Sequence, residues 1–340
     1  MPHIAKNVLL ALALGVFQGS AWAQTPLPAL GARADSVTVS GLSSGAFMAV
    51  QFHVAHSSQV SGAGVLAGGP YYCAMGTMML TAACMSPSSS LPVPPLRDMV
   101  SEARKQAREQ AIDNLDNLAR SRLWLLSGGR DGTVKTAVVD QTYDFYRNWV
   151  PASAIEYERI ADAGHAMLSA TAKDANDCAV TGTPFINRCG DFDAPGRLLA
   201  HLLGTLNPPA DTHDAALLAF DQHAFTTGTD SMDRTAYVYV PAACREGGCR
   251  VHIAFHGCMQ QAETIGTVFV REAGYNRWAE SNKLIVLYPQ TIKNRQINPT
   301  KTNPYGCWDW WGYTGPNYHT QAGAQIRAVK AMLDRLTSKP

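Results

Sequence analysis

The stretch from residue 36 to residue 54, SVTVSGLSSGAFMAVQFHV, constrains the fold more than any other part of the chain. It opens with a β-branched run at 37–39, which is typical of a strand. It then passes through GLSSG at 41–45 and continues into 46–55, an apolar segment of good helix formers without a breaker. A G-x-S-x-G pentapeptide between a strand and a helix predicts a sharp turn that presents its central serine, Ser43, as a nucleophile.

The glycines on either side of Ser43 fit this interpretation. Gly41 and Gly45 lack the Cβ atoms that would collide in so tight a turn. The turn would expose the Ser43 hydroxyl and direct the Ser44 amide toward the place where a carbonyl oxygen develops negative charge. The alternative is a Gly/Ser loop that joins two core elements, because the pentapeptide also occurs by chance. The flanking strand and helix favour the nucleophile.

The composition is that of a globular protein. The length of 340 residues allows one large domain or two ordinary ones. Apolar residues make up 46% of the chain, enough for a large core, whereas charged residues make up 16% and the formal net charge is +1. Because the sequence has no basic stripe and no charged tail, we expect no nucleic acid partner. Helical patterns at 97–118 and 265–281 alternate with short apolar strands.

The first 23 residues have the character of a secretory signal peptide. A basic start precedes an apolar run at 8–17, and AWA at 21–23 matches the small-x-small pattern of a cleavage site. The alternative is an N-terminal membrane anchor, which needs a longer apolar run. We therefore expect residues 1–23 to be removed and the remainder to be secreted, extracellular or alternatively periplasmic, without attachment to a membrane.

The chain contains eight cysteines, which in an exported protein predict disulfide bonds. Eight cysteines allow on the order of a hundred pairings, so proximity in the sequence is the only guide. No C-x-x-C or H-E-x-x-H motif is present, and we expect neither a metal nor another cofactor. Proximity favours Cys73–Cys84, Cys178–Cys189 and Cys244–Cys249, and leaves Cys258 with Cys307.

Three candidate catalytic residues follow one another, each just after a predicted strand. Ser43 follows the first strand, Asp131 lies in a glycine-rich loop after the strand at 123–126, and His165 follows the strand at 155–160. This order of serine, acid and histidine is that of the α/β hydrolases. Because polar groups at the carboxyl ends of parallel strands gather at one edge of the sheet, we expect these three to meet. His165 would take the Ser43 proton, and Asp131 would fix the histidine tautomer.

Alternatives remain for the acid and the histidine. Asp131 could serve only as a turn former before a glycine, and His165 could be a solvated loop histidine. Asp140 and Asp162 are the other acids nearby. The first falls inside a predicted helix at 136–149, and the second lies too close to His165 in the sequence to orient it, so Asp131 is favoured.

The second half of the chain holds elements that the hydrolase order places before the nucleophile. An apolar strand at 251–255 ends in HGC at 256–258, and a strand ending in His-Gly usually supplies an oxyanion-hole amide. Joining the C-terminal helix at 322–336 to the N-terminus restores the usual order, which termini close in space would permit. The sequence therefore predicts a circularly permuted α/β-hydrolase fold with a mostly parallel central sheet flanked by helices. We expect one catalytic domain, 24–340, whose part 24–206 carries the nucleophile, acid and histidine and whose part 235–337 carries the oxyanion strand.

Five motifs together resemble the single-domain, circularly permuted extracellular poly(3-hydroxybutyrate) depolymerases: GLSSGAFMA, SGGRDGTV, AGHAM, HGC and NPYGCWDWWGY. The resemblance spans nearly all of the chain after residue 23. It implies a serine esterase that hydrolyses the polyester and its oligomers through an acyl-enzyme intermediate. It implies a Ser43–Asp131–His165 triad and an oxyanion hole made by the amides of Ser44 and Cys258.

The resemblance also implies an aromatic crevice that accepts a single polyester chain, lined by Trp311 or a neighbour in the loop 303–313. Trp308, Trp310 and Trp311 are the candidates. An aromatic cleft with few charges suits an apolar, uncharged polymer. A tryptophan cluster in an α/β fold is also commonly structural. We expect a monomer whose partner is the polyester chain or its oligomers.

Two other functions stay open at this point. The unpermuted relatives include acetylxylan and feruloyl esterases, so a carbohydrate esterase is the alternative within the enzyme class. Outside that class, the alternative is a non-catalytic polyester-binding protein on a hydrolase scaffold. The complete Ser-Asp-His set argues against the second alternative.

Overall fold

A computed structural model describes residues 25–228, 230–294 and 302–340 of the chain. The predicted signal peptide at 1–23 lies outside the described residues. Within the described ranges, no helix is long and apolar enough to cross a membrane.

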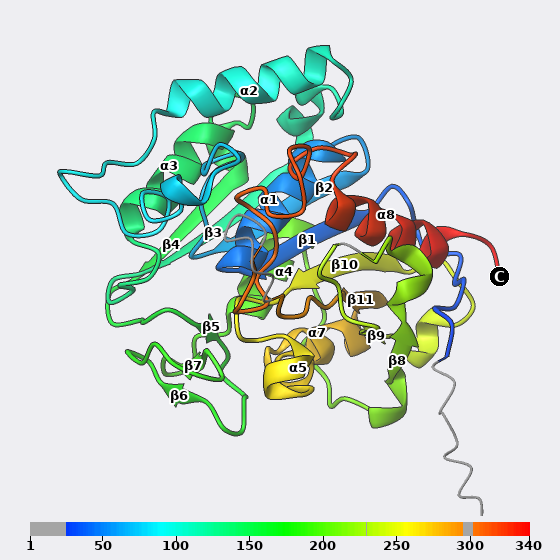
Figure 1. Cartoon of the computed structure of the whole chain (residues 1–340). Helices are drawn as coiled ribbons and strands as arrows, with labels where there is room; N and C mark the ends of the chain where they lie inside the picture. The colour runs from blue at the N-terminus through cyan, green and yellow to red at the C-terminus, as the bar shows by residue number, and fades with distance from the viewer. Residues whose placement is uncertain (1–24, 229, 295–301) are drawn as a thin grey trace, which may run out of the picture.

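An eight-stranded sheet forms the centre of the fold, with the strand order β4-β3-β2-β1-β10-β11-β9-β8 (Figure 1). The strand β1 pairs in parallel with both β2 and β10, whereas β9 runs antiparallel to both of its neighbours. All residues of β1 and β11 are buried, as expected where helices cover both faces of a parallel sheet. The strands of this sheet are β1 (Val37–Leu42), β2 (Val60–Leu66), β3 (Arg122–Gly128), β4 (Ile155–Ile160), β8 (Leu217–Asp221), β9 (Thr235–Tyr239), β10 (Arg250–Phe255) and β11 (Leu284–Tyr288).

The strand before Ser43 is central in the sheet and lies beside a strand from the C-terminal part of the chain. The two parts are also joined at their ends, because the amides of Leu30 and Ala32 donate to the carbonyl of Leu336 and the amide of Gly31 donates to that of Ser338. The beginning and the end of the described fold therefore run side by side (Figure 1). This arrangement confirms the predicted circularly permuted α/β-hydrolase fold.

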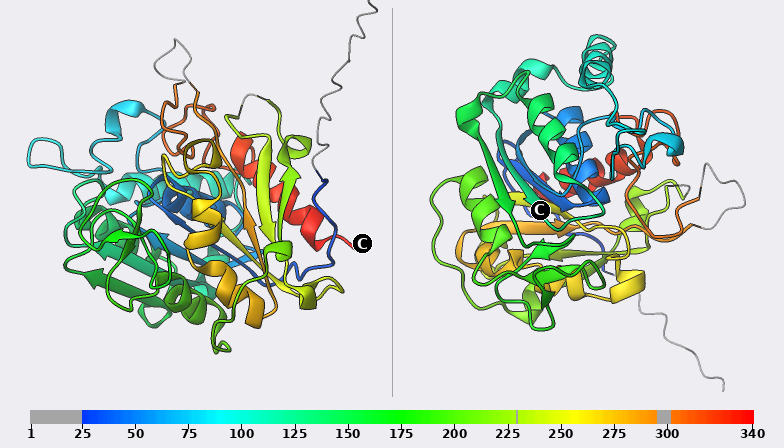
Figure 2. Two further views of the ribbon diagram at one scale, coloured as in Figure 1. Left: turned by 90° about the horizontal axis from the view of Figure 1, so that it is seen from below. Right: turned by 90° about the vertical axis from the view of Figure 1, so that its left-hand side faces the viewer.

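Helices cover both faces of the sheet, with α1 on one face and the packed pair α4 and α7 on the other (Figure 2). Every residue of α1 is buried, and its internal polar groups find partners. Gln51 donates to the carbonyl of Asp309, and His53 bonds to Tyr146 and Ser121. The helices are α1 (Ser44–Ala55), α2 (Leu96–Arg108), α3 (Thr136–Tyr146), α4 (Ala194–Leu203), α5 (Ala262–Ile265), α6 (Val268–Glu272), α7 (Tyr275–Ser281) and α8 (Ala324–Thr337).

Three local features differ from the expectations. The helix expected at 97–118 ends at Arg108, because Gln110 adopts a positive φ of 58° that no helix continues. The helix expected at 265–281 is interrupted twice, at Gly266 with a φ of 59° and at Gly274 with a φ of 104°. A small second sheet, β5 (Met167–Leu168), β7 (Ile186–Arg188) and β6 (Asn176–Asp177), was not foreseen, because its strands are too short to show a period.

All four expected disulfide bonds are present, and no cysteine is free among the described residues, which include all eight. Three of them close short loops of 5 or 11 residues in sequence separation. The fourth, Cys258–Cys307, spans 49 residues and joins the loop after β10 to the tryptophan-rich loop. No group of three or more metal-ligating side chains occurs in the described part of the chain.

Candidate active site

The turn between β1 and α1 has the strained geometry that the sequence predicted. Ser43 has φ 56° and ψ −124°, a conformation that non-glycine residues rarely adopt. A Cβ on Gly41 would lie 2.2 Å from the carbonyl oxygen of Gly45. A Cβ on Gly45 would lie 2.4 Å from the carbonyl oxygens of Phe255 and His256, at the end of β10. Gly41 thus serves the turn itself, whereas Gly45 allows the loop after β10 to approach it.

Asp131 and His165 meet at the same edge of the sheet. The His165 Nδ1 lies 2.7 Å from Asp131 Oδ2, and both side chains are buried. The other carboxylate oxygen, Oδ1, accepts the amides of Thr133 and Val134 at 2.8 Å each. A carboxylate oxygen accepts here, so Nδ1–H of His165 donates to Asp131 and Nε2 is the ring nitrogen that remains for another partner.

The backbone around His165 is hydrogen-bonded to the segment 178–181, which follows β6 of the small second sheet. The amide of Gly164 donates to the carbonyl of Cys178, and the amide of His165 donates to Thr181 Oγ1 at 3.0 Å. A Cβ on Gly164 would lie 2.5 Å from two carbonyl oxygens of the 179–180 segment. The segment that follows β6 therefore packs closely against the backbone at Gly164 and His165.

The two other acids considered from the sequence do not reach His165. Asp140 accepts hydrogen bonds from Tyr157 at 2.8 Å and from Arg159 at 2.6 Å. Asp162 is exposed and pairs with Arg130 at 3.3 Å. Neither is positioned to orient the imidazole.

A cavity of about 640 Å³ opens between these elements. Both Ser43 and His165 line this cavity. Within the described structure, no hydrogen bond joins the Ser43 hydroxyl to His165. Such a bond often shortens only when substrate binds, so its absence here does not argue against the pair. The wall is mostly apolar. Its lining residues are Leu42, Ser43, Ser44, Phe47, Met78, Thr81, Met85, Thr133, Val134, His165, Thr181, Phe185, Gly257, Cys258, Met259, Gln260, Thr302, Asn303, Pro304, Tyr305, Cys307, Trp310 and Trp311.

The two candidate oxyanion donors, Ser44 and Cys258, both line this cavity. Ser44 is the first residue of α1, so its amide has no acceptor within the helix. Gly257, the residue before Cys258, donates its own amide to Gln260 Oε1 at 2.7 Å. No hydrogen bond from the Cys258 amide to another described residue is found. Both amides are therefore available to a ligand oxygen.

The three candidate tryptophans occupy different environments. Trp310 stacks on Phe47 with ring centroids 4.2 Å apart, and Trp311 meets Trp310 edge-on at 5.5 Å. Trp308 is fully buried and packs against Phe255 and His256. The structure thus brings Trp310 and Trp311 to the cavity but places Trp308 in the core.

A buried carboxylate shapes the turn that carries these rings. Asp309 Oδ1 accepts the amides of Trp311, Gly312 and Tyr313 at 2.7 to 3.2 Å. Its Oδ2 accepts both the amide and the hydroxyl of Thr314 at 2.7 Å. Burial raises the pKa of Asp309, and these hydrogen bonds oppose that shift.

Several wall residues were not expected from the sequence. Phe47 lies on α1, and Phe185 directly precedes β7 of the small sheet. Met78 begins a short 3₁₀ helix at 78–80, and Tyr305 lies in an irregular loop. Phe47 could have been found, since it lies one helical turn after Ser43. The loop residues carry no such signal.

No family model matches the sequence. Two curated proteins are similar over most of its length. A poly(3-hydroxybutyrate) depolymerase of Delftia acidovorans is 41% identical over 98% of this chain and 67% of the relative, and a polyhydroxybutyrate depolymerase of Talaromyces funiculosus is 34% identical over 96% of both. Two solved structures are similar at a TM-score of 0.85, covering 92% of this chain and 99% of each neighbour. They are the PHB depolymerase from Penicillium funiculosum, 32% identical, and a PHB depolymerase complexed with an R3HB trimer, 31% identical.

Proposed function

We propose, from the premise that this chain belongs to the poly(3-hydroxybutyrate) depolymerase family, that it is a secreted serine esterase that hydrolyses this polyester and its oligomers. The observation that carries the proposal is the apolar cavity that contains Ser43, His165 and two unused backbone amides. A cavity with few polar groups suits an uncharged aliphatic polyester. Four disulfide bonds support export to an oxidising compartment, extracellular or alternatively periplasmic.

The proposed reaction begins with attack of Ser43 Oγ on an ester carbonyl. His165 Nε2 takes the hydroxyl proton, and the Asp131 carboxylate stabilises the imidazolium through Nδ1–H. The amides of Ser44 and Cys258 donate to the carbonyl oxygen as it becomes negative. When the tetrahedral intermediate collapses, His165 returns the proton to the departing alkoxide. Water then repeats the sequence on the acyl-enzyme, releasing a carboxylic acid and restoring Ser43.

The tryptophan-rich loop supplies the proposed wall for the polymer. Trp310 and Trp311 present apolar area beside the candidate oxyanion hole, whereas Trp308 stabilises the loop from below. The proposal treats residues 24–340 as one catalytic domain acting as a monomer after removal of residues 1–23. Its two permuted parts, 24–206 and 235–337, meet at the pairing of β1 with β10.

The test is release of soluble product from a poly(3-hydroxybutyrate) suspension by the purified chain, with Ser43→Ala alongside. We expect Ser43→Ala to lower the rate by about 10⁴ or more while circular dichroism stays unchanged, because removal of a triad nucleophile has effects of this size. The matched control is Ser44→Ala, which keeps the amide and loses only a hydroxyl that accepts the Trp308 amide; it should retain most of the turnover.

Three outcomes would contradict the proposal. One is a Ser43→Ala variant that keeps about a tenth of wild-type turnover, a loss far below that of a triad nucleophile. A second is hydrolysis of acetylated xylan or methyl ferulate without any of the polyester, which would favour a carbohydrate esterase. The third is polymer binding without hydrolysis of polymer or p-nitrophenyl butyrate, which would favour the non-catalytic alternative.

A further inference from the structure

The Gly257–Cys258 peptide is held in place from its carbonyl side. In a trans peptide the C=O and N–H point in opposite directions, so whatever fixes the Gly257 carbonyl also aims the Cys258 amide. That carbonyl lies 2.7 Å from Nδ1 of the buried His256. A carbonyl oxygen can only accept, so His256 donates its Nδ1 proton. The Cys258 N–H then points away from this bond, and Cys258 is a lining residue of the cavity.

The second nitrogen of His256 is engaged as an acceptor. The amide of Thr291 donates to Nε2 at 3.2 Å. Burial lowers the pKa of His256 to about 4, so the imidazole is neutral at neutral pH. One nitrogen must donate and the other must accept, and a neutral ring with its proton on Nδ1 satisfies both. The ring is therefore fixed in one tautomer as well as in one place.

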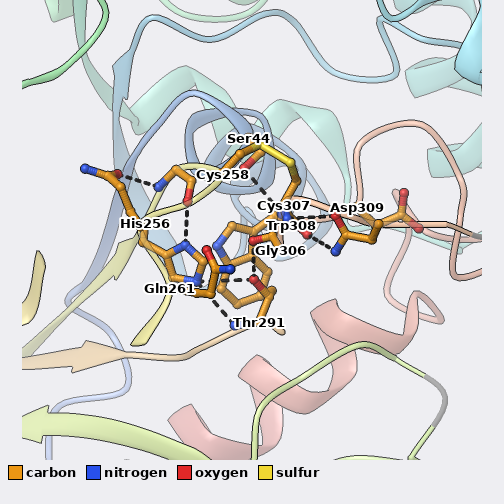
Figure 3. The surroundings of a disulfide bond; sticks show 12 residues. Ser44, His256, Cys258, Gln261, Thr291, Gly306, Cys307, Trp308 and Asp309 are labelled. Carbon is orange, nitrogen blue, oxygen red and sulfur yellow. Dashed lines mark hydrogen bonds between the residues drawn. A yellow bond between two sulfur atoms is a disulfide. The ribbon is translucent and has the colours of Figure 1, made fainter. Parts of the chain in front are cut away.

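Thr291 carries the same support across to the disulfide. Its hydroxyl donates to the carbonyl of Gly306 at 2.6 Å, and Gly306 precedes Cys307, which is bonded to Cys258. These contacts form a closed ring (Figure 3). The disulfide joins Cys258 to the residue after Gly306, Thr291 is hydrogen-bonded to both Gly306 and His256, and His256 is hydrogen-bonded to the carbonyl of the peptide before Cys258. Such a ring leaves the peptide plane little freedom to rotate.

We infer that His256 and Thr291 are positioning residues that aim the Cys258 amide at the developing oxyanion, without touching the substrate themselves. Neither is among the residues that line the cavity. The inference rests on the proposed function, since it assigns a purpose to the Cys258 amide in ester hydrolysis. It predicts that loss of the Nδ1 donor weakens binding of the transition state and leaves binding of the ground-state ester almost unchanged.

A neighbouring histidine provides the matched control. His252 is also fully buried on β10, but its nitrogens bond to the hydroxyls of Thr38 and Ser40 inside the sheet. Replacing it removes two buried hydrogen bonds without changing any group at the cavity. A merely structural role for His256 would make His256→Leu and His252→Leu behave alike, each less stable and each with normal kcat in its folded fraction.

The experiment measures kcat and KM for p-nitrophenyl butyrate, together with inhibition by butaneboronic acid, at a temperature where every variant is folded. Boron adds the serine oxygen and becomes tetrahedral, so its affinity reports the oxyanion site. For His256→Leu we expect kcat to fall about tenfold to hundredfold with KM within about threefold, and boronate affinity to fall in parallel; complete removal of one oxyanion donor has effects of about 10² to 10³. His256→Asn, whose Nδ2–H can replace Nδ1–H, should recover most of the loss.

Two results would overturn the inference. One is a folded His256→Leu with kcat and boronate affinity like those of His252→Leu. If His256→Leu does not fold, the kcat of Thr291→Val is compared with that of Thr291→Ser, because only Thr291→Val lacks the hydroxyl that donates to Gly306. The second result that would overturn the inference is an equal kcat in these two variants. Failure of the proposed function is distinguishable, since it would appear as wild-type inactivity or as persistent activity in Ser43→Ala.

Discussion

Two regions that line the cavity, the elbow at 41–45 and the loop at 303–313, obtain their shapes in different ways. The turn of the elbow is defined by its own residues, because Gly41 and a strained Ser43 turn a strand directly into a helix, and Gly45 then admits the loop after β10. The loop at 303–313 contains neither helix nor strand, and partners from elsewhere hold it. Its contacts include Gln51 on α1, Gln325 on α8 and the disulfide to Cys258.

This difference explains why the structure of the elbow could be predicted from the sequence and that of the loop could not. A turn fixed by local sterics leaves a recognisable short pattern, so the role of each elbow residue could be predicted. The loop at 303–313 is held by distant contacts together with its own Asp309 carboxylate, and this arrangement leaves no short recognisable pattern in the sequence. Its tryptophans are conspicuous, but the ring that faces the cavity is decided by the Asp309 carboxylate and by Phe47.

The largest effect is expected at the elbow. In Gly45→Ala, the new Cβ would lie 2.4 Å from two backbone carbonyl oxygens at the end of β10, so the elbow and the oxyanion loop must separate. We predict a loss of about a hundredfold or more in kcat, since a shift of about 1 Å at a catalytic group costs that much. Gly132→Ala, with nothing within 4 Å of its Cβ, is the control and should be nearly silent. Equal effects in the two variants would contradict the account of the elbow.

Asp309→Asn tests how the loop at 303–313 is held. The amide places an NH₂ group among five donors, so at least one backbone amide loses its acceptor. We expect the free energy of unfolding to fall by about 2 to 4 kcal/mol, because hydrogen bonds to charged groups contribute about 1.5 to 3 kcal/mol each. Urea unfolding measures the change. The control is the exposed ion pair of Asp162 with Arg130, where Asp162→Asn should lower the free energy of unfolding by less than about 1 kcal/mol.

The tryptophans separate recognition of the polymer from chemistry. Trp311→Ala should lower polymer hydrolysis at least about tenfold, since about 1.4 kcal/mol of lost apolar contact corresponds to one decade. It should change p-nitrophenyl butyrate turnover much less, because a short ester fills fewer subsites.

Trp308→Ala should instead lower the free energy of unfolding by about 3 to 5 kcal/mol, as for a large residue removed from a core. The measurement is the ratio of the two activities in each variant. Parallel loss of both activities in all three Trp→Ala variants, with unfolding, would place the whole loop in the core.

The smallest effect is expected where the two regions are linked. Selective reduction of Cys258–Cys307 should lower activity several-fold before the protein unfolds, because it frees the oxyanion loop from the tryptophan-rich loop. Activity and circular dichroism followed together during reduction would detect this. Replacement of the Cys244–Cys249 pair by serines is the control, since that bond has a sequence separation of 5 and neither of its cysteines lines the cavity. Simultaneous loss of activity and structure would contradict the link.

The fold and the main candidates were accessible from the sequence for physical reasons. β-Branched and continuous apolar runs located the central strands, and the order of Ser43, Asp131 and His165 after successive strands predicted that they share an edge. The structure brings Asp131 and His165 into contact and places Ser43 on the same cavity. The small sheet behind His165 could not be predicted, because strands of two or three residues carry no periodic signal. The support from Thr291 joins residues distant in the chain and leaves no motif at all.

If Ser43 is the nucleophile, it is the residue that an organophosphate labels. The purified chain is treated with diethyl p-nitrophenyl phosphate, and its peptides are then analysed by mass spectrometry. We expect a single diethylphosphoryl group on Ser43, formed much more slowly in His165→Ala, with loss of polymer hydrolysis in proportion to labelling. Full labelling at another residue, or full inactivation with Ser43 unmodified, would contradict it.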